Sequence, residues 1–377
     1  MKVLVTGADG FIGRNLRQRL SERRDVEAAP MTSSNSAGWT PEVLGGVDFV
    51  MHLAGANRPD DPADFMRVNR DFTASLCEAV SRESRATGRR IPILFASSAQ
   101  ADRNDSLYAQ SKRAAEAVLA KAARENGIPT HIFRLPNVFG KWCRPNYNSA
   151  VATFCFNTAR DLPLTIHDPA ASLTLVYVDD VVERFIQLLD GAASNLDANG
   201  FEAIAPQYHT TVGAVADEIR RFKESRGALT PGRVGAGLLR ALYSTYLSYL
   251  PPEDFSYPLR EHVDRRGKFV EYLKTPDCGQ LSYFTAHPGV TRGGHYHHTK
   301  IEKFLVVKGR ARFKFHNVQD GRNHEIQTSG DKAEVVESIP GWAHDITNIG
   351  DDELVVMLWA NEVFDPAHPD TYSHATS

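Results

Sequence analysis

The sequence predicts an α/β domain with a parallel sheet, followed by an all-β barrel or sandwich. Over the first 250 residues, short apolar runs alternate with amphipathic stretches, which is the rhythm of β-α-β units. From Lys268 onward, short β-prone runs follow one another closely, with Gly and Asp turns between them. A length of 377 residues is enough for two or three domains. The Pro251-Pro252 pair marks a helix end and a stiff linker, so we expect domains at residues 1–255 and 256–377.

The strands expected in the first part have nearly continuous apolar residues. That pattern is typical of parallel strands, because helices cover both faces of such a sheet. The expected strands span residues 2–6, 47–53, 92–96 and 131–135, and the amphipathic helices between them span residues 15–23, 65–82 and 107–125. In the second part, strands are expected at residues 302–307, 311–316, 333–339 and 353–359.

Composition and charge exclude several classes of protein. With 42% hydrophobic and 24% charged residues, bulk disorder is excluded. A net charge of −3 argues against a nucleic-acid partner, which requires a basic surface. No apolar run of about 18 residues could span a membrane, and no basic leader with an apolar core opens the chain. The four cysteines lie far apart without a CxxC pair, so we expect no disulfide scaffold and a cytoplasmic location.

Glycines follow the first expected strand at a spacing that suits a phosphate-binding turn. Gly7, Gly10 and Gly13 form a GxxGxxG pattern between a strand and a helix. Glycine permits the backbone angles of a tight turn and lets a pyrophosphate approach closely. The helix N-terminus then presents N–H groups and a partial positive charge to the anion. The pattern therefore indicates a dinucleotide cofactor.

The end of the second expected strand bears on which dinucleotide is bound. An acidic residue at this position binds the ribose hydroxyls of NAD. Here residues 26–34 read VEAAPMTSS, so hydroxyls rather than an acid follow the strand, and Arg14 follows the last glycine. Because the extra phosphate of NADP(H) would repel a carboxylate, we expect NADP(H).

Four polar residues indicate an acid–base site. Tyr108 and Lys112 are four apart on an expected helix and so share a face. Ser97 and Ser98 end the preceding strand, at the carboxyl edge where parallel sheets bind ligands. A lysine ammonium about 4 Å from a phenol, at an effective dielectric of about 20, lowers the pKa of the phenol by about three units. The sequence thus predicts a tyrosine tuned for proton transfer by Lys112.

Together these motifs resemble an extended short-chain dehydrogenase/reductase, which has a Rossmann sheet. The glycine loop, residues 52–55 (HLAG), Asn69, the Ser-Ser pair, YxxxK and residues 134–140 (RLPNVFG) occur in the order of that family. The resemblance implies that Ser98 orients a substrate carbonyl, with Ser97 as the alternative serine. It implies that Tyr108 transfers the proton, while Lys112 holds the nicotinamide ribose. The implied cofactor-binding residues are Gly7, Gly10, Phe11, Ile12, Gly13, Arg14, Ala54 and Lys112.

The same resemblance narrows the reaction and suggests where substrate binds. The family's 4,6-dehydratases carry an Asp-Glu pair directly after the Ser/Thr, whereas Ala99-Gln100 stand there in this chain. Oxidation or reduction at a sugar C4 is therefore favoured over dehydration. By family position, Asn137 is expected to contact the substrate. Arg144 and Lys141 suit a nucleotide diphosphate or, alternatively, belong to a solvated loop.

A set of histidines with one glutamate marks the second part. His295 and His297 point to the same face if they lie on a strand; Glu302 follows, and His344 comes after residues 340–343 (PGWA). Three imidazoles and one carboxylate suit a divalent metal such as zinc, nickel, manganese or iron. Both halves of the set resemble the two motifs of a cupin, over residues 268–377. The resemblance implies a metal site at His295, His297, Glu302 and His344, with zinc as the expected metal.

A metal beside a keto-sugar reductase suggests a second reaction. A ketone acidifies its neighbouring carbon, and a Lewis acid on the oxygen stabilises the enolate that remains when the C3 proton leaves. Reprotonation from the other face inverts C3. Lys300, Lys303 and His316 are candidate bases by proximity in sequence.

A reductase followed by a cupin resembles the capsular polysaccharide synthesis enzyme CapF family over the whole chain, including residues 254–259 (DFSYPL) and 266–274 (RGKFVEYLK). The resemblance implies a homodimer paired through the cupin, and two steps towards UDP-N-acetyl-L-fucosamine. The cupin epimerises C3 of a UDP-2-acetamido-2,6-dideoxy-4-hexulose of the L series, and the reductase domain reduces C4 with NADPH to the L-talose derivative. One alternative is a 4-keto-sugar reductase whose cupin only dimerises or regulates. Another is a non-catalytic sugar-nucleotide sensor, which would consume no NADPH.

Overall fold

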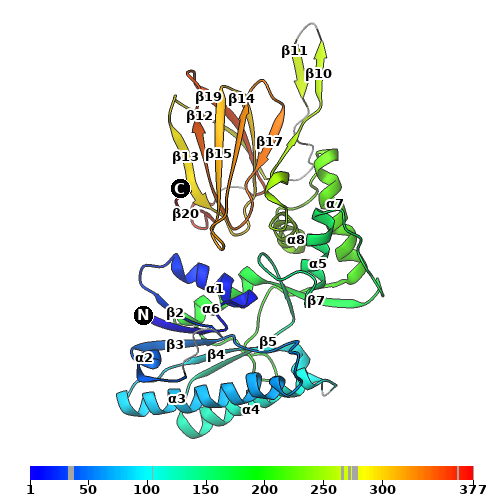
Figure 1. The fold of residues 1–377 in the computed structure, drawn as a ribbon. Helices are drawn as coiled ribbons and strands as arrows, with labels where there is room; N and C mark the ends of the chain where they lie inside the picture. Colours follow the sequence, from blue (N-terminus) through cyan, green and yellow to red (C-terminus); the bar gives the residue numbers. More distant parts are fainter. Residues whose placement is uncertain are drawn as a thin grey trace. The chain divides into compact units, whose positions relative to one another are not determined.

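The computed structural model describes residues 1–32, 38–103, 105–264, 267–270, 273, 279–362 and 365–376. The chain forms two compact units (Figure 1). The first unit comprises Met1–Val138 with Thr174–Tyr208, and the second comprises Phe139–Leu173 with His209–Ser377. None of the helices in the described ranges combines the length and the apolar content that crossing a membrane requires.

The first unit is built on a parallel sheet with the strand order β2-β1-β3-β4-β5. Val3 and Ile93 are fully buried, as expected for strands covered on both faces. The chain runs from β1 to β2 on one side, and β3 then pairs on the other side of β1, so the usual ligand position is at the carboxyl ends of β1 and β3. The strands are β1 (Lys2–Thr6), β2 (Glu27–Met31), β3 (Val47–His52), β4 (Ile93–Ser98) and β5 (Thr130–Leu135).

Helices flank this sheet (Figure 1). The hydroxyl of Ser106 caps α4 by accepting a hydrogen bond from the Ala109 N–H at 3.2 Å, and Gly127 ends the helix in a left-handed conformation. The single helix expected at residues 65–82 is instead a π-helix, η1, that continues into α3. The helices are α1 (Phe11–Ser21), α2 (Pro41–Leu44), η1 (Phe65–Asp71), α3 (Phe72–Thr87), the 3-10 turn η2 (Ala99–Asp102), α4 (Leu107–Asn126) and α6 (Val178–Leu189).

The second unit contains two five-stranded antiparallel sheets, β12-β19-β14-β17-β9 and β16-β15-β18-β13-β20. The sheets pack face to face, since the rings of Phe304 in β14 and Phe313 in β15 are 5.6 Å apart. This confirms an antiparallel β domain. Its strands are β9 (Ser256–Pro258), β12 (Gln280–Ala286), β13 (Thr291–Tyr296), β14 (Glu302–Lys308), β15 (Arg310–Asn317), β16 (Asn323–Ser329), β17 (Glu334–Glu337), β18 (Trp342–Asn348), β19 (Leu354–Ala360) and β20 (Tyr372–Ser373).

Two smaller groups of strands and four helices complete the described chain. The strands β10 (Glu261–Asp264) and β11 (Gly267–Val270) pair with each other. The sheet β6-β7-β8 includes the points at which the chain passes between the units. The remaining elements are β6 (Asn137–Phe139), β7 (Ser172–Tyr177), β8 (Tyr208–Thr211), α5 (Ala150–Ala159), α7 (Val212–Ala228), α8 (Gly237–Leu247) and the 3-10 turn η3 (Pro252–Asp254).

The compact units do not divide at the linker near residue 255. The helices α5, α7 and α8 precede that linker and yet belong to the second unit. Arg226 of α7 forms an ion pair of 3.1 Å with the buried Glu337 of β17, which also pairs with Lys303 of β14 at 2.6 Å. These ion pairs show that α7 packs directly against the β domain. The domain boundary at residue 255 stays a prediction.

Candidate functional sites

The glycine loop joins β1 to α1 and has no room for larger residues. Gly7 has a φ of +65°, and a Cβ on it would lie 2.6 Å from the backbone nitrogen of Ala54. A Cβ on Gly13 would lie 2.2 Å from the carbonyl oxygen of Gly7. Gly10 caps α1 without a side-chain hydrogen bond, so no cap side chain covers the first-turn N–H groups. The loop thus fits a pyrophosphate group.

The other residues expected at the cofactor lie around this loop. Phe11 and Ile12 open α1 and are half-buried, and Arg14 follows on the same helix. Ala54 is the second residue after the end of β3 and lies next to Gly7. Ser33 and Ser34, on which the expectation of NADP(H) partly depends, lie outside the described residues. The choice of NADP(H) over NAD stays a prediction.

A buried hydrogen-bond network fixes the segment that follows β3. The ring of His52 contacts the hydroxyl of Thr6 at 2.7 Å and that of Thr73 at 2.8 Å. Burial, reinforced by the charge of Lys112, lowers the pKa of His52 to about 3, so this ring is neutral. The amide of Asn69, in η1, bonds both backbone groups of Ala56 at 2.8 and 2.9 Å. His52 and Asn69 therefore shape the loop that faces the glycine turn.

The structure brings Ser98 and Tyr108 together. Ser98 ends β4, and its side chain lies close enough to the hydroxyl of Tyr108, in the first turn of α4, to act on the pKa of that phenol. Lys112 lies one turn further along α4, is 5% exposed, and donates a hydrogen bond of 3.0 Å to the carbonyl of Ala96. A Cβ on Gly55 would lie 3.0 Å from the Lys112 ammonium nitrogen. The three residues expected for catalysis thus lie at the carboxyl end of β4.

The expected tuning of Tyr108 is not what the structure produces. Burial raises the pKa of Tyr108, and the neighbouring Ser98 side chain only partly opposes that shift. Burial also lowers the pKa of Lys112 to about 8, against the charge of Glu116, which raises it. The Lys112 ammonium bonds a backbone carbonyl, and desolvation of the phenol outweighs any charge effect on Tyr108. The prediction that Lys112 lowers the pKa of Tyr108 is therefore wrong for this structure.

Ser97 is engaged elsewhere. Its hydroxyl donates a hydrogen bond of 2.5 Å to Glu116, which also pairs with Arg134 at 2.7 Å. Of the two serines that the sequence leaves open, Ser98 is the one beside Tyr108. Glu116 was missed at the sequence level, although its spacing of four from Lys112 places it on the same helix face.

The two residues expected at the substrate lie in different units. Asn137 donates a hydrogen bond of 3.2 Å to the carbonyl of Thr174 in the first unit. Arg144, in the second unit, lies over the ring of Tyr147 at 5.0 Å. Lys141 is fully buried, which argues against a purely solvated loop at that position. The substrate roles of Asn137 and Arg144 stay predictions.

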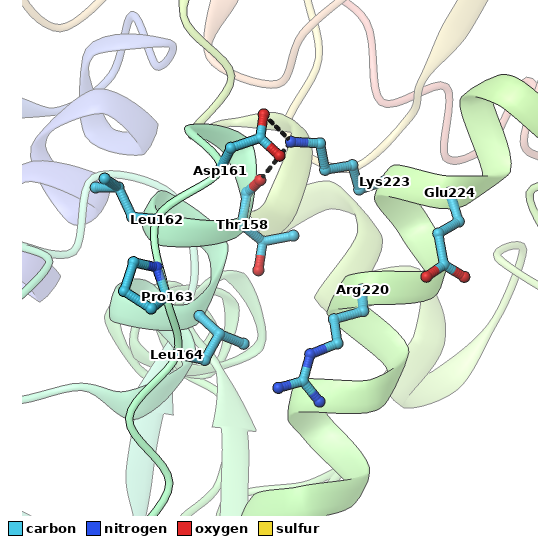
Figure 2. Close-up of a pocket in the computed structure, with 8 residues that line it drawn as sticks. All are labelled: Thr158, Asp161, Leu162, Pro163, Leu164, Arg220, Lys223 and Glu224. Atoms are coloured by element: carbon cyan, nitrogen blue, oxygen red, sulfur yellow. Dashed lines mark hydrogen bonds and ion pairs between the residues drawn. The ribbon is translucent and has the colours of Figure 1, made fainter.

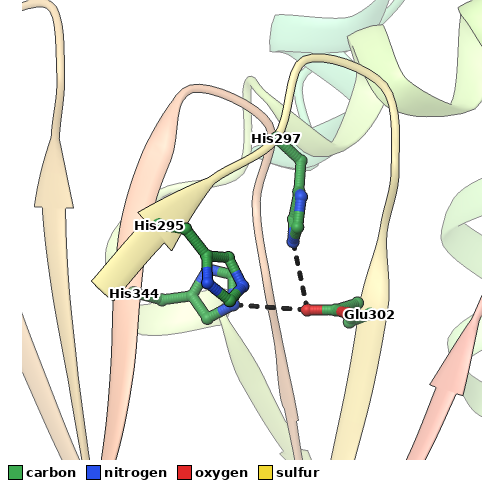
Figure 3. A group of neighbouring side chains, drawn as sticks. All are labelled: His295, His297, Glu302 and His344. Carbon is green, nitrogen blue, oxygen red and sulfur yellow. Dashed lines mark hydrogen bonds and ion pairs between the residues drawn. The ribbon is translucent and has the colours of Figure 1, made fainter. Parts of the chain in front are cut away.

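The four expected metal ligands gather between the two sheets of the β domain (Figure 3). One ligand atom from each of His295, His297, Glu302 and His344 lies within 4.8 Å of the others. A carboxylate oxygen of Glu302 is 3.1 Å from Nε2 of His297 and 3.3 Å from Nε2 of His344. The described residues contain no other cluster of this kind. The geometry thus agrees with the expected ligand set.

The charge states in this cluster suit a cation. Burial works to raise the pKa of Glu302, but its contacts with His297 and His344 prevail and hold that pKa well below its ordinary value. Burial and the neighbouring histidines lower the pKa of His295 to about 3. An ionised carboxylate and a neutral imidazole are the forms that bind a divalent metal.

Of the three candidate bases named from sequence proximity, two point away from the ligands and one lies in the loop beside them. Lys303 is adjacent to Glu302 on β14 and therefore points to the opposite face, where it pairs with Glu337. His316 stacks on His374 at 5.2 Å and lies on the face of β15 opposite Phe315, whose ring is 6.4 Å from that of His344. Lys300 lies in the loop between the ligands and donates to the hydroxyl of Thr371 at 2.8 Å. Of the three candidates, Lys300 is the one that lies in the loop that also carries the ligand His297.

A shallow pocket of about 360 Å³ lies elsewhere in the second unit (Figure 2). Lys223 of α7 crosses its rim, pairing with Asp161 at 2.6 Å and donating to the carbonyl of Thr158 at 3.1 Å. None of the site residues expected from the sequence lines this pocket.

Comparisons with known proteins agree with this architecture. Residues 3–199 match the NAD dependent epimerase/dehydratase family, and residues 262–372 match the family described as polysaccharide biosynthesis C-terminal domain. The chain is 58% identical to UDP-2-acetamido-2,6-beta-L-arabino-hexul-4-ose reductase of Pseudomonas aeruginosa strain PA103, over 99% of this chain and 98% of that protein.

Solved structures show similarity over the whole chain as well. The crystal structure of the capsular polysaccharide assembling protein CapF from Staphylococcus aureus is similar with a TM-score of 0.68 and 40% identity, over 100% of both chains. A CapF structure with the inhibitor 3-isopropenyl-tropolone has a TM-score of 0.63 and 38% identity, again over 100% of both chains. The chain therefore belongs to the NAD dependent epimerase/dehydratase family and, within it, to the CapF family of capsular polysaccharide proteins.

Proposed function

We propose that this chain is a nucleotide-sugar reductase that uses NADPH to reduce the C4 ketone of a UDP-linked 2-acetamido-2,6-dideoxy-4-hexulose of the L series. The observation that carries the proposal is the grouping of Ser98 at the end of β4 with Tyr108 in the first turn of α4 and the buried Lys112 one helical turn further on. The Pseudomonas relative supports the substrate class, because it is named as a UDP-hexul-4-ose reductase and aligns with 99% of this chain.

In the proposed reaction the chain's own side chains bind, orient and supply a proton. Ser98 and Tyr108 donate hydrogen bonds to the ketone oxygen, and Tyr108 passes its proton to that oxygen as negative charge develops there. Lys112 binds the nicotinamide ribose. The cofactor, when bound at the glycine loop, supplies the hydride.

We further propose that residues 256–377 form a cupin that inverts C3 of the same sugar before reduction, so that the product is the L-talose derivative. His295, His297, Glu302 and His344 would hold a divalent ion, with zinc as the expected metal. When bound, such an ion supplies a Lewis acid for the negative charge that develops on a ketone oxygen as the neighbouring carbon loses its proton. The donor set fits, because three imidazoles and one carboxylate converge within 4.8 Å.

A second candidate is a reductase whose β domain serves only to pair two copies, and the outer face of one sheet favours such pairing. Leu281 and Tyr283 of β12 are 60% and 73% exposed, and Val307 of β14 and Met357 of β19 are 42% and 37% exposed. Tyr283 is the cross-strand partner of Met357, and Leu281 lies two residues away on the same strand, so these three side chains share one apolar surface. We propose a homodimer through this surface under either candidate.

A deuterium-exchange experiment tests the epimerase. The full-length chain is incubated with the UDP-4-keto sugar in D2O without NADPH, and the sugar is examined by NMR. We expect deuterium at C3, and we expect His295→Ala to abolish its uptake. NADPH consumption without exchange at C3 would instead support the second candidate, a reductase whose β domain only pairs two copies.

The same reaction with NADPH tests the reductase. We expect Tyr108→Phe to lower kcat by about 10²- to 10⁴-fold, because the proton donor is lost, while C3 exchange continues. Wild-type protein that consumes no NADPH with this substrate would contradict both candidates and favour a sensor.

A further inference from the structure

We propose that helix α8 and Asp370 position the loop that holds the metal ligands, so that metal affinity depends on a helix lying before the expected domain boundary. The loop comprises residues 297–301, between β13 and β14, with His297 at its start and Glu302 directly after it. This proposal rests on the proposed metal site, and it adds residues that support the site without being metal ligands themselves.

The helix α8 holds the middle of the loop. Arg240 donates a hydrogen bond of 2.5 Å from its guanidinium to the hydroxyl of Thr299. Ser244, one turn further along α8, donates a hydrogen bond of 3.0 Å to the backbone carbonyl of the same residue. Ser244 is fully buried and Thr299 is 5% exposed, so water does not replace these contacts. The hydroxyl and the backbone carbonyl of Thr299 are therefore both held by one helix.

Asp370 holds the loop from a second direction. Its carboxylate accepts hydrogen bonds from three consecutive backbone N–H groups, those of His298 at 3.0 Å, Thr299 at 2.8 Å and Lys300 at 2.7 Å. Three N–H groups that converge on one carboxylate define the backbone path of the loop.

The same residue sets the orientation of one ligand. The backbone carbonyl of Asp370 lies 2.6 Å from Nδ1 of His297. Since a carbonyl only accepts, Nδ1 carries the hydrogen, and Nε2 is the nitrogen that faces Glu302 at 3.1 Å. Contacts of this type fix the tautomer and ring direction of a metal-binding histidine. Arg240 and Ser244 thus place the loop, and Asp370 places the loop and the ring, so all three are positioning residues.

Zinc affinity of the full-length chain tests the inference. The protein is stripped of metal, and its affinity for zinc is measured by competition with a chromophoric chelator. We expect Arg240→Ala to weaken zinc binding by about 10- to 100-fold, the usual effect of losing an outer-shell contact. Arg240→Lys, which keeps a donor, should recover part of the affinity. The matched control is Arg221→Ala, on the exposed surface of α7, which should bind zinc as the wild type does.

Two further readouts separate positioning from a general loss of stability. Cobalt substituted for zinc should give an altered visible spectrum in Arg240→Ala, because the loop carries His297 into the ligand set. If Arg240→Ala does not fold, Ser244→Ala carries the same test with a smaller change. Zinc affinity unchanged in both variants would overturn the inference. A wild-type chain that binds no zinc would instead contradict the proposed metal site.

Discussion

Burial acts in opposite directions on two side chains of one helix, Tyr108 and Lys112. It raises the pKa of Tyr108, which keeps the phenol protonated at neutral pH, the form that a proton donor to a ketone requires. It lowers the pKa of Lys112 to about 8, so the ammonium form persists only below that value.

The pKa of Lys112 predicts how stability depends on pH. The unfolded lysine has a pKa of 10.5 and the folded one about 8, so between these values the unfolded chain binds more protons and stability rises with pH. We expect the free energy of unfolding of the wild type, relative to Lys112→Met, to rise by about 3 kcal/mol from pH 8 to pH 10.5. Urea unfolding at a series of pH values measures this difference. A difference that stays constant with pH would show that Lys112 is not desolvated.

The two serines at the end of β4 should respond differently to removal of the hydroxyl. Ser98→Ala should lower kcat by about 10²-fold, because a donor to the developing oxyanion is lost. Ser97→Ala should instead reduce stability by about 2 kcal/mol, since it removes a hydrogen bond to the buried Glu116 carboxylate. NADPH consumption and thermal unfolding of both variants check the assignment. The reverse pattern would make Ser97 the catalytic serine.

At the scale of elements, the packing of α1 against the glycine loop that follows β1 depends on the absence of a side chain at Gly13. Gly13→Ala should destabilise the protein by about 1–3 kcal/mol and weaken NADPH binding, because its Cβ would lie 2.2 Å from the Gly7 carbonyl. Gly227→Ala is the matched control. Gly227 lies in α7 with nothing within 4 Å of its Cβ position, so alanine should stabilise that helix by up to about 1 kcal/mol. Calorimetry and cofactor fluorescence measure both effects, and equal behaviour of the two variants would contradict the account of the loop.

At the scale of the whole molecule, the apolar face of β12, β19 and β14 predicts association. We expect the wild type to have the mass of a dimer by light scattering, and Tyr283→Asp to be a monomer, because a charge would be buried on pairing. Leu196→Asp is the control, since Leu196 is an apolar residue of the first unit with a similar exposure of 56%. A wild-type monomer, or a dimer that persists in Tyr283→Asp, would rule out this face.

Much of the fold and of the candidate sites could be predicted from local patterns. The expected strand at residues 2–6 is β1, and the expected helix at residues 107–125 is α4 to within one residue. The four expected ligands come together between two sheets. These predictions succeed because strand periodicity, glycine spacing and ligand type are properties of short segments. The π-helix η1 was not foreseen, since its apolar pattern is that of an ordinary helix.

The sequence by itself determined a parallel α/β part, an antiparallel β part, the glycine turn and the residues able to bind a metal. Tertiary structure alone decided that Ser98 rather than Ser97 lies beside Tyr108, that burial raises the pKa of Tyr108, and that α8 contacts the loop of His297. The physical reason is that burial, hydrogen-bond partners and charge neighbours depend on residues far apart in the chain. Thr299 and Asp370 are 71 residues apart, and no local pattern specifies that one holds the other.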